Sequence, residues 1–165
     1  MEMDSLRKLY VDELKDLYSA EKQILQALPK MVKKASNDKL KKAFEEHLRV
    51  TEKQVERLDR IFEKLGKAAR GKKCKGMEGL LEEGKEMMQE DMEPEVMDAA
   101  LIAAAQRVEH YEMAGYGTVR TYAQLLGEDE QAKLLQQTLD EEGDADKLLS
   151  QLAESEINVE ATVGA

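Results

Sequence analysis

The sequence is poor in the residues that form β-sheets, disulfides and loops. Among its 165 residues there are one cysteine, two prolines, ten glycines and no tryptophan, and aromatic residues make up 4%. A single cysteine excludes a disulfide within the chain and is typical of a reducing compartment. Runs rich in Val, Ile and Thr are missing, so there is little from which to build a sheet. These absences favour an all-α fold.

Positive charge and long apolar runs are also scarce. The chain has 25 Lys and Arg against 35 Asp and Glu, a formal net charge of −10. This argues against a nucleic-acid partner, because phosphate contacts need clustered cations. There is no N-terminal signal pattern, and no apolar run approaches the roughly 18 residues of a membrane span. The sequence therefore predicts a cytoplasmic protein without membrane attachment.

The residues that are abundant favour helices, and apolar side chains recur at helical spacing. One stripe alternates steps of four and three residues: Phe44, Leu48, Thr51, Val55, Leu58, Phe62 and Leu65. Gly66 can end this helix, and Pro94 suits the first turn of a later one. The pattern predicts helices at about 4–34, 37–65, 77–89, 94–126 and 129–156, in a single domain of residues 1–165.

The connections between these stretches predict how the helices are arranged. Short turns at 36–38 and 127–129 make two antiparallel hairpins. The connection between the hairpins is long enough to cross the bundle, since a helix of about 30 residues spans roughly 45 Å. A single long crossover is the wiring of a ferritin-like four-helix bundle, whereas an up-down bundle needs only short loops. We therefore expect a ferritin-like bundle whose crossover contains a short fifth helix.

Acidic residues occupy positions on the predicted buried stripes. Glu21 lies on the first helix, Glu109 and Glu112 on the third long helix, and Glu142 and Asp146 on the fourth. Burying ionised carboxylates without partners is costly. Acids that converge from separate helices therefore predict a bound divalent cation, for which carboxylate oxygens are suitable ligands.

The sequence leaves several alternatives open. Helical phase cannot separate Glu141 from Glu142, because paired leucines precede and follow both. Some of the acids could instead pair with Lys or Arg at the margin of the bundle. His47 can reach the centre or stay partly exposed, and we expect the latter. His110 lies about 100° from Glu109 around its helix, so we expect it at the boundary.

Five segments carry a resemblance to a known family: LYSAEKQILQAL (17–28), HLRVTEKQVERLD (47–59), MEGLLEE (77–83), DAALIAAAQRVEHYEMAGYGT (98–118) and TLDEEGDADKLL (138–149). In these segments the chain resembles the YciF-like and YciE-like family of bacterial stress proteins. That family is ferritin-like and is described as a domain of unknown function. The wider superfamily holds two metals with a Glu, a Glu-x-x-His, a further Glu and a second Glu-x-x-His.

This resemblance implies particular ligands. Glu21 matches the first-helix Glu and Glu109 the third-helix Glu, and Glu112 is similar to an additional ligand of rubrerythrins. In the second helix the motif falls on Thr51 and Gln54, neither of which is anionic, and Gln54 offers only an amide oxygen. For the fourth helix the resemblance supports two registers: Glu142 with Asp146, or Glu141 with Asp144.

Two functions compete. The first is a ferritin-like protein that binds iron or another divalent metal, reacts with dioxygen or peroxide, and is at most a weak ferroxidase or peroxide-reducing enzyme in a stress response. The second is a non-enzymatic dimeric structural or interaction module whose acidic site is a relic. The sequence leaves open whether the chain holds two ions, one or none. In either case we expect a homodimer.

Overall fold

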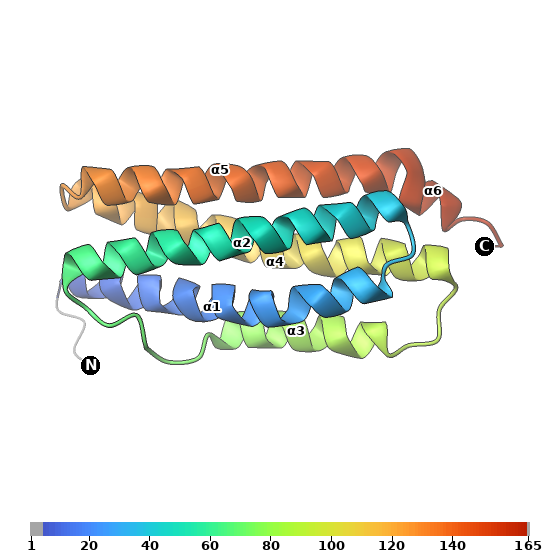
Figure 1. The fold of residues 1–165 in the computed structure, drawn as a ribbon, viewed down its shortest axis with the longest axis horizontal. Coiled ribbons are helices and arrows are strands. Elements are labelled where there is room, and N and C mark those ends of the chain that lie inside the picture. The colour runs from blue at the N-terminus through green and yellow to red at the C-terminus, as the bar shows by residue number, and fades with distance from the viewer. Residues whose placement is uncertain (1–4, 165) are drawn as a thin grey trace.

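The computed structural model describes residues 5–164, and within this range the chain forms helices and no strands. Four long helices lie side by side (Figure 1): α1 (Leu6–Lys34), α2 (Asp38–Leu65), α4 (Pro94–Leu125) and α5 (Asp129–Leu152). The shorter α3 (Lys75–Met88) packs against α1 and α4. A π-helical turn (Ala153–Ile157) and α6 (Asn158–Glu160) follow α5. The expected helix start at residue 4 and the expected domain limits, residues 1 and 165, lie outside the described residues.

Local signals in the sequence set the ends of the helices. The Ser5 hydroxyl accepts a hydrogen bond from the backbone of Lys8, and the Asn37 side chain caps α2. Gly66 and Gly127 take positive φ angles of 63° and 74°, which other residues rarely adopt. Cys74 is the N-cap of α3, so the helix expected at 77–89 runs from Lys75 to Met88.

The order of the helices confirms the all-α, ferritin-like bundle. α1 and α2 form one antiparallel hairpin, and α4 and α5 form the other (Figure 1). The segment that contains α3 runs along the bundle from the end of α2 to the start of α4, so α2 and α4 point in the same direction. Asp98 near the start of α4 accepts hydrogen bonds from the backbone of Ser36 and Asn37. These bonds hold the turn between α1 and α2 against α4.

The core consists of two hydrophobic clusters with a polar layer between them. One cluster surrounds Ile24 and Leu149, and the other surrounds Leu14 and Tyr116. The buried polar residues between them come from all four long helices: Glu21, Thr51, Gln54, Glu109, Glu112 and Glu142. The two clusters stabilise the bundle on either side, and the layer can therefore serve a purpose other than packing.

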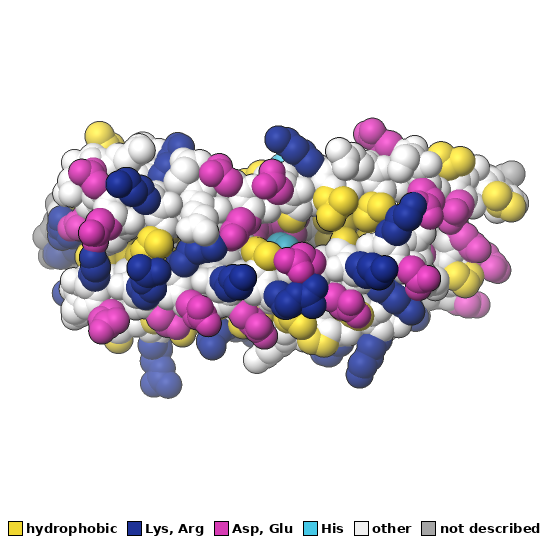
Figure 2. All heavy atoms as spheres, turned by 45° about the horizontal axis from the view of Figure 1, so that its top comes forward, with side chains coloured by type: hydrophobic (Ala, Val, Ile, Leu, Met, Phe, Trp, Pro, Cys, Tyr) yellow, Lys and Arg dark blue, Asp and Glu magenta, His cyan; other side chains and the backbone are white. Residues whose placement is uncertain are grey.

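The surface alternates in charge. On the face drawn in Figure 2, basic and acidic side chains are interspersed. Many of the hydrophobic side chains on this face lie along its middle, between the charged side chains of neighbouring helices. Among residues 5–164, every helix is too short or too polar to cross a membrane.

Two glycines of α4 allow a matched test of the packing between α1 and α4. A Cβ atom at Gly115 would lie 2.6 Å from Cδ2 of the buried Leu17, whereas one at Gly117 would meet nothing within 4 Å. We expect Gly115→Ala to lower the free energy of unfolding by about 1–3 kcal/mol through overpacking. Gly117→Ala should raise it by about 0.5–1 kcal/mol through helix propensity. Urea denaturation of both variants measures the difference, and equal effects would contradict the close packing.

Candidate metal centre

Four glutamates that the sequence placed on buried stripes converge inside the bundle. Glu21 comes from α1, Glu109 and Glu112 come from successive turns of α4, and Glu142 comes from α5. Glu109 is 2% exposed and the other three are fully buried. Helical spacing explains this arrangement, because residues three apart on α4 share a face and the neighbouring helices present their own inward positions to it.

The ligand atoms of these side chains form two overlapping groups. His47, Glu109 and Glu142 make one group, and Glu21, Glu112 and Glu142 make the other. Within each group the nitrogen and oxygen atoms lie within 4.8 Å of one another. Glu142 belongs to both, so its two oxygens can serve neighbouring cation positions.

Most of the polar atoms in these groups have no hydrogen-bond donor when the acids are ionised, although Glu109 lies close to Glu142 and Glu21 close to Glu112. In the part of the chain that the structure describes, this holds for Glu21 Oε2, His47 Nε2, Glu109 Oε2 and both carboxylate oxygens of Glu112 and Glu142. Buried acceptors are normally paired, since leaving one unpaired costs about 1–3 kcal/mol. So many unpaired acceptors in one layer fit a site that binds cations or protons.

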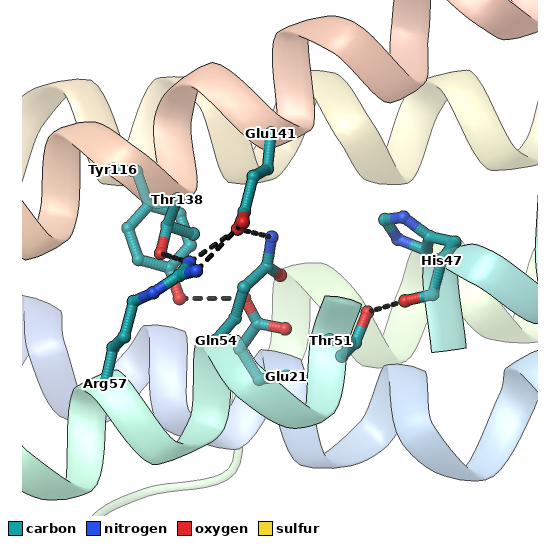
Figure 3. A network of polar contacts seen from close by, with 8 residues as sticks. All are labelled: Glu21, His47, Thr51, Gln54, Arg57, Tyr116, Thr138 and Glu141. Atoms are coloured by element: carbon teal, nitrogen blue, oxygen red, sulfur yellow. Dashed lines mark hydrogen bonds and ion pairs between the residues drawn. The ribbon is translucent and has the colours of Figure 1, made fainter. Parts of the chain in front are cut away.

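His47 brings nitrogen to the site from α2. Its side chain is 10% exposed, and Nε2 lies 3.1 Å from Glu109 Oε1 without forming a hydrogen bond. Thr51 lies one turn further along α2, and its hydroxyl donates to the backbone oxygen of His47 at 2.7 Å (Figure 3). Thr51 therefore uses its proton within its own helix. Among the described residues, α2 contributes His47 to the group with Glu109 and Glu142.

Two side chains next to the site form an ion pair. Arg57 of α2 is 9% exposed and contacts both carboxylate oxygens of Glu141, at 2.5 and 2.8 Å. Gln54 Nε2 donates to the same carboxylate, as Figure 3 shows. Glu141 is thus held by α2 at the edge of the layer, while Glu142 turns inward.

The other two candidate ligands on α5, Asp144 and Asp146, lie further out. Asp144 is exposed, away from the two groups. Asp146 Oδ1 lies 3.3 Å from Nε2 of His110, whose side chain is 67% exposed. Asp146 is not in either group of ligand atoms among the described residues, although its charge acts on Glu109. Of the two registers considered for α5, the structure turns Glu142 inward and places Asp146 beside the site.

Burial governs the protonation of the acids. Loss of water, and next the charge of Glu142, raises the pKa of Glu21 to about 8. The same two causes raise the pKa of Glu109 well above its usual range. Burial and the charge of Glu21 do so for Glu112. The metal-free layer therefore retains protons near neutral pH.

Tyr116 orients one of the ligands. Its hydroxyl is buried on α4 and donates to Glu21 Oε1 at 2.7 Å. Burial, and then the charge of Glu21, raises the pKa of this phenol, so it remains a donor. The bond fixes one oxygen of Glu21 and leaves Oε2 unpaired towards the other acids.

The donor set fits a divalent metal. Carboxylates with one imidazole suit iron, manganese or zinc, and the unpaired atoms converge from different helices. Sequence reasoning identified the four glutamates, but it expected His47 to stay partly exposed instead of joining them and did not identify the role of Arg57. A possible signal was its position three residues after Gln54, on the same face of α2.

Comparison with known proteins gives consistent matches along the chain. Residues 5–162 match the model of the family described as "Domain of unknown function (DUF892)". Protein YciF of Escherichia coli K12 is 47% identical over 116 residues, 70% of each chain.

Solved structures also match. The E. coli stress protein YciF superposes with a TM-score of 0.91 at 46% identity, over 94% of this chain and 99% of that one. YcfI from Rhodopseudomonas palustris has a TM-score of 0.87 at 41% identity, over 91% and 97%. A protein of Xanthomonas campestris, 21% identical over 92% of both chains, shares the fold with a TM-score of 0.74. By sequence and structure, this ferritin-like chain belongs to the DUF892 family, and YciF is one of its relatives.

Proposed function

We propose that this protein binds two divalent metal ions, iron among them, in the polar layer of the bundle. The observation that carries the proposal is the pair of overlapping ligand groups that share Glu142 and whose buried acceptors lack partners. The name of the E. coli relative, a stress protein, leads us to place the function in a stress response.

The charge of the layer can balance two divalent ions. Four ionised glutamates carry four negative charges, and two divalent cations balance them. With one divalent ion, two of the four acids would keep their protons, as their raised pKa values allow, whereas with two ions all four can be ionised ligands. Arg57 neutralises Glu141 separately, so that acid does not change the balance.

The protein's own residues prepare the site in three ways. The Tyr116 hydroxyl orients Glu21, and His47 supplies a nitrogen. The raised pKa values of Glu21, Glu109 and Glu112 mean that metal binding releases protons. Bound iron would supply one-electron chemistry with dioxygen or peroxide. On this basis we expect at most a slow ferroxidase or peroxide-reducing activity.

A small cavity borders one ligand group. It has a volume of about 40 Å³ and is lined by apolar side chains, Phe44 and Leu148 among them, except for His47 and Glu109. Apart from these two side chains, the lining offers no hydrogen bonds to a polar molecule. The cavity therefore suits dioxygen better than hydrogen peroxide, which needs hydrogen bonds.

The two histidines provide a test of the proposal with an internal control. Wild-type protein treated with chelator and reloaded with Fe²⁺ without oxygen should hold two ions per chain, measured by mass spectrometry of the metal. His47→Ala should hold one, because its group loses the imidazole. His110→Ala should hold two, since that side chain is 67% exposed and outside both groups.

The outcome also separates the competing functions. Two ions in His47→Ala would contradict the ligand role of His47. A wild-type protein that takes up no metal, and shows no absorbance change when Fe²⁺ is added in air, would instead support a non-enzymatic structural module with a relic site.

A further inference from the structure

Gln54 is held from one side by a chain of hydrogen bonds. The residue is fully buried on α2, and its Nε2 donates to Glu141 Oε1 at 3.3 Å. Both oxygens of Glu141 accept from Arg57, which also donates to Thr138 Oγ1 at 3.0 Å. The amide therefore contacts a carboxylate whose orientation is fixed by a bidentate contact with the Arg57 guanidinium (Figure 3).

This contact determines which way the amide points. An ionised carboxylate only accepts hydrogen bonds, so the end of Gln54 that faces Glu141 has to be its NH₂ group. The carbonyl oxygen then faces the opposite side, towards Glu21 in Figure 3. Gln54 Oε1 is buried and has no hydrogen-bond partner within residues 5–164. Without Glu141 the amide could turn over and present hydrogens, which repel a cation.

We propose that Gln54 Oε1 is an oxygen ligand for the cation of the Glu21–Glu112–Glu142 group, and that Arg57 and Glu141 position it. The inference rests on the proposed metal function and extends it to a residue outside the two groups of acids and imidazole. Amide oxygens are ordinary ligands for hard cations. A neutral ligand also adds an oxygen without adding charge to a layer in which two divalent ions already balance four glutamates.

Arg57 is suited to this positioning role. Its planar guanidinium donates hydrogen bonds to both oxygens of Glu141. A lysine has a single ammonium group and would leave the carboxylate free to rotate. The pair also cancels its own charge within the bundle. Arg57 and Glu141 thus set the orientation of the amide and contribute no net charge to the metal positions.

The test is a double-mutant cycle on metal affinity. Mn²⁺ is titrated calorimetrically into chelator-treated wild type, Gln54→Leu, Glu141→Gln and the double variant. Gln54→Leu should weaken one of the two ions about tenfold or more, by removing a ligand oxygen. Glu141→Gln should weaken the same ion, because a glutamine can donate or accept and no longer fixes the amide. In the Gln54→Leu background, Glu141→Gln should have a much smaller effect, which comes only from the Arg57 charge that it leaves unbalanced.

Each other result has a definite meaning. Additive effects would overturn the positioning role, because a merely structural contribution of Glu141 persists when Gln54 is changed. Wild-type affinity for both ions in Gln54→Leu, alongside loss of one ion in Glu112→Gln, would overturn the ligand role and leave the metal function standing. No binding by wild type would overturn both. If Gln54→Leu does not fold, Gln54→Met removes the same oxygen at similar length.

Discussion

Replacing Glu142 with glutamine should abolish binding at both metal positions. This residue belongs to both groups of ligand atoms, and both of its oxygens are buried without partners. The substitution keeps the volume but removes the charge and one oxygen. Changing an outer-shell partner of a metal typically costs about 10–100-fold in affinity, and the loss of a shared ligand should cost more. The metal content after reloading, measured by mass spectrometry, should fall from two ions per chain to none.

Asp144→Asn provides the control for this substitution. Asp144 is an acid two residues away on the same helix, but it is exposed and outside both groups. The variant should retain two ions. Retention of two ions by Glu142→Gln, or loss of metal in Asp144→Asn, would favour the other register of α5 and contradict the site described above.

Metal-free protein should become less stable as the pH rises from about 5 to about 8. Burial raises the pKa of Glu21 to about 8, whereas in the unfolded chain it is near 4.5. Between these values the folded state binds more protons than the unfolded state, so the free energy of unfolding falls with pH. Each unit of pKa shift corresponds to about 1.4 kcal/mol, so the loss amounts to several kcal/mol. Urea denaturation in the presence of chelator measures it.

Two further measurements make this pH dependence specific. Glu21→Gln has no carboxyl group to titrate and should show a smaller loss. Saturating metal should reverse the slope, because bound cations favour the ionised acids and binding releases protons. Bonds to lysines lower the pKa values of the surface acids Glu130 and Glu156. Protonation of these acids therefore changes the free energy of unfolding only below about pH 4.5, outside this window. A stability of the metal-free protein that rises towards pH 8 would contradict the buried acidic layer.

The fold was predictable from the sequence because its signals are local. The Asn37 cap, the glycines at 66 and 127, and Pro94 at the start of α4 mark the helix ends directly. Apolar spacing shows which face of each helix is buried. The long connection between the hairpins then selects the ferritin-like wiring, since short loops cannot join opposite ends of the bundle.

The candidate site was only partly predictable, because the outcome depends on contacts between helices. Helical phase places Glu21, Glu109 and Glu112 inward, but Glu141 and Glu142 are adjacent and phase alone cannot choose between them. The structure separates them through Arg57, a partner 84 residues away in sequence. The direction of His47 likewise depends on the position of Glu109 on α4, which no pattern within α2 reveals.

Anomalous X-ray scattering from crystals grown without chelator and loaded with Fe²⁺ tests the central claim most directly. Data collected at the iron absorption edge should show two peaks inside the bundle, one beside His47 and Glu109 and one beside Glu21 and Glu112, with Glu142 between them. Peaks confined to the surface, or an interior in which the four glutamates pair with one another through protons and hold no metal, would contradict it.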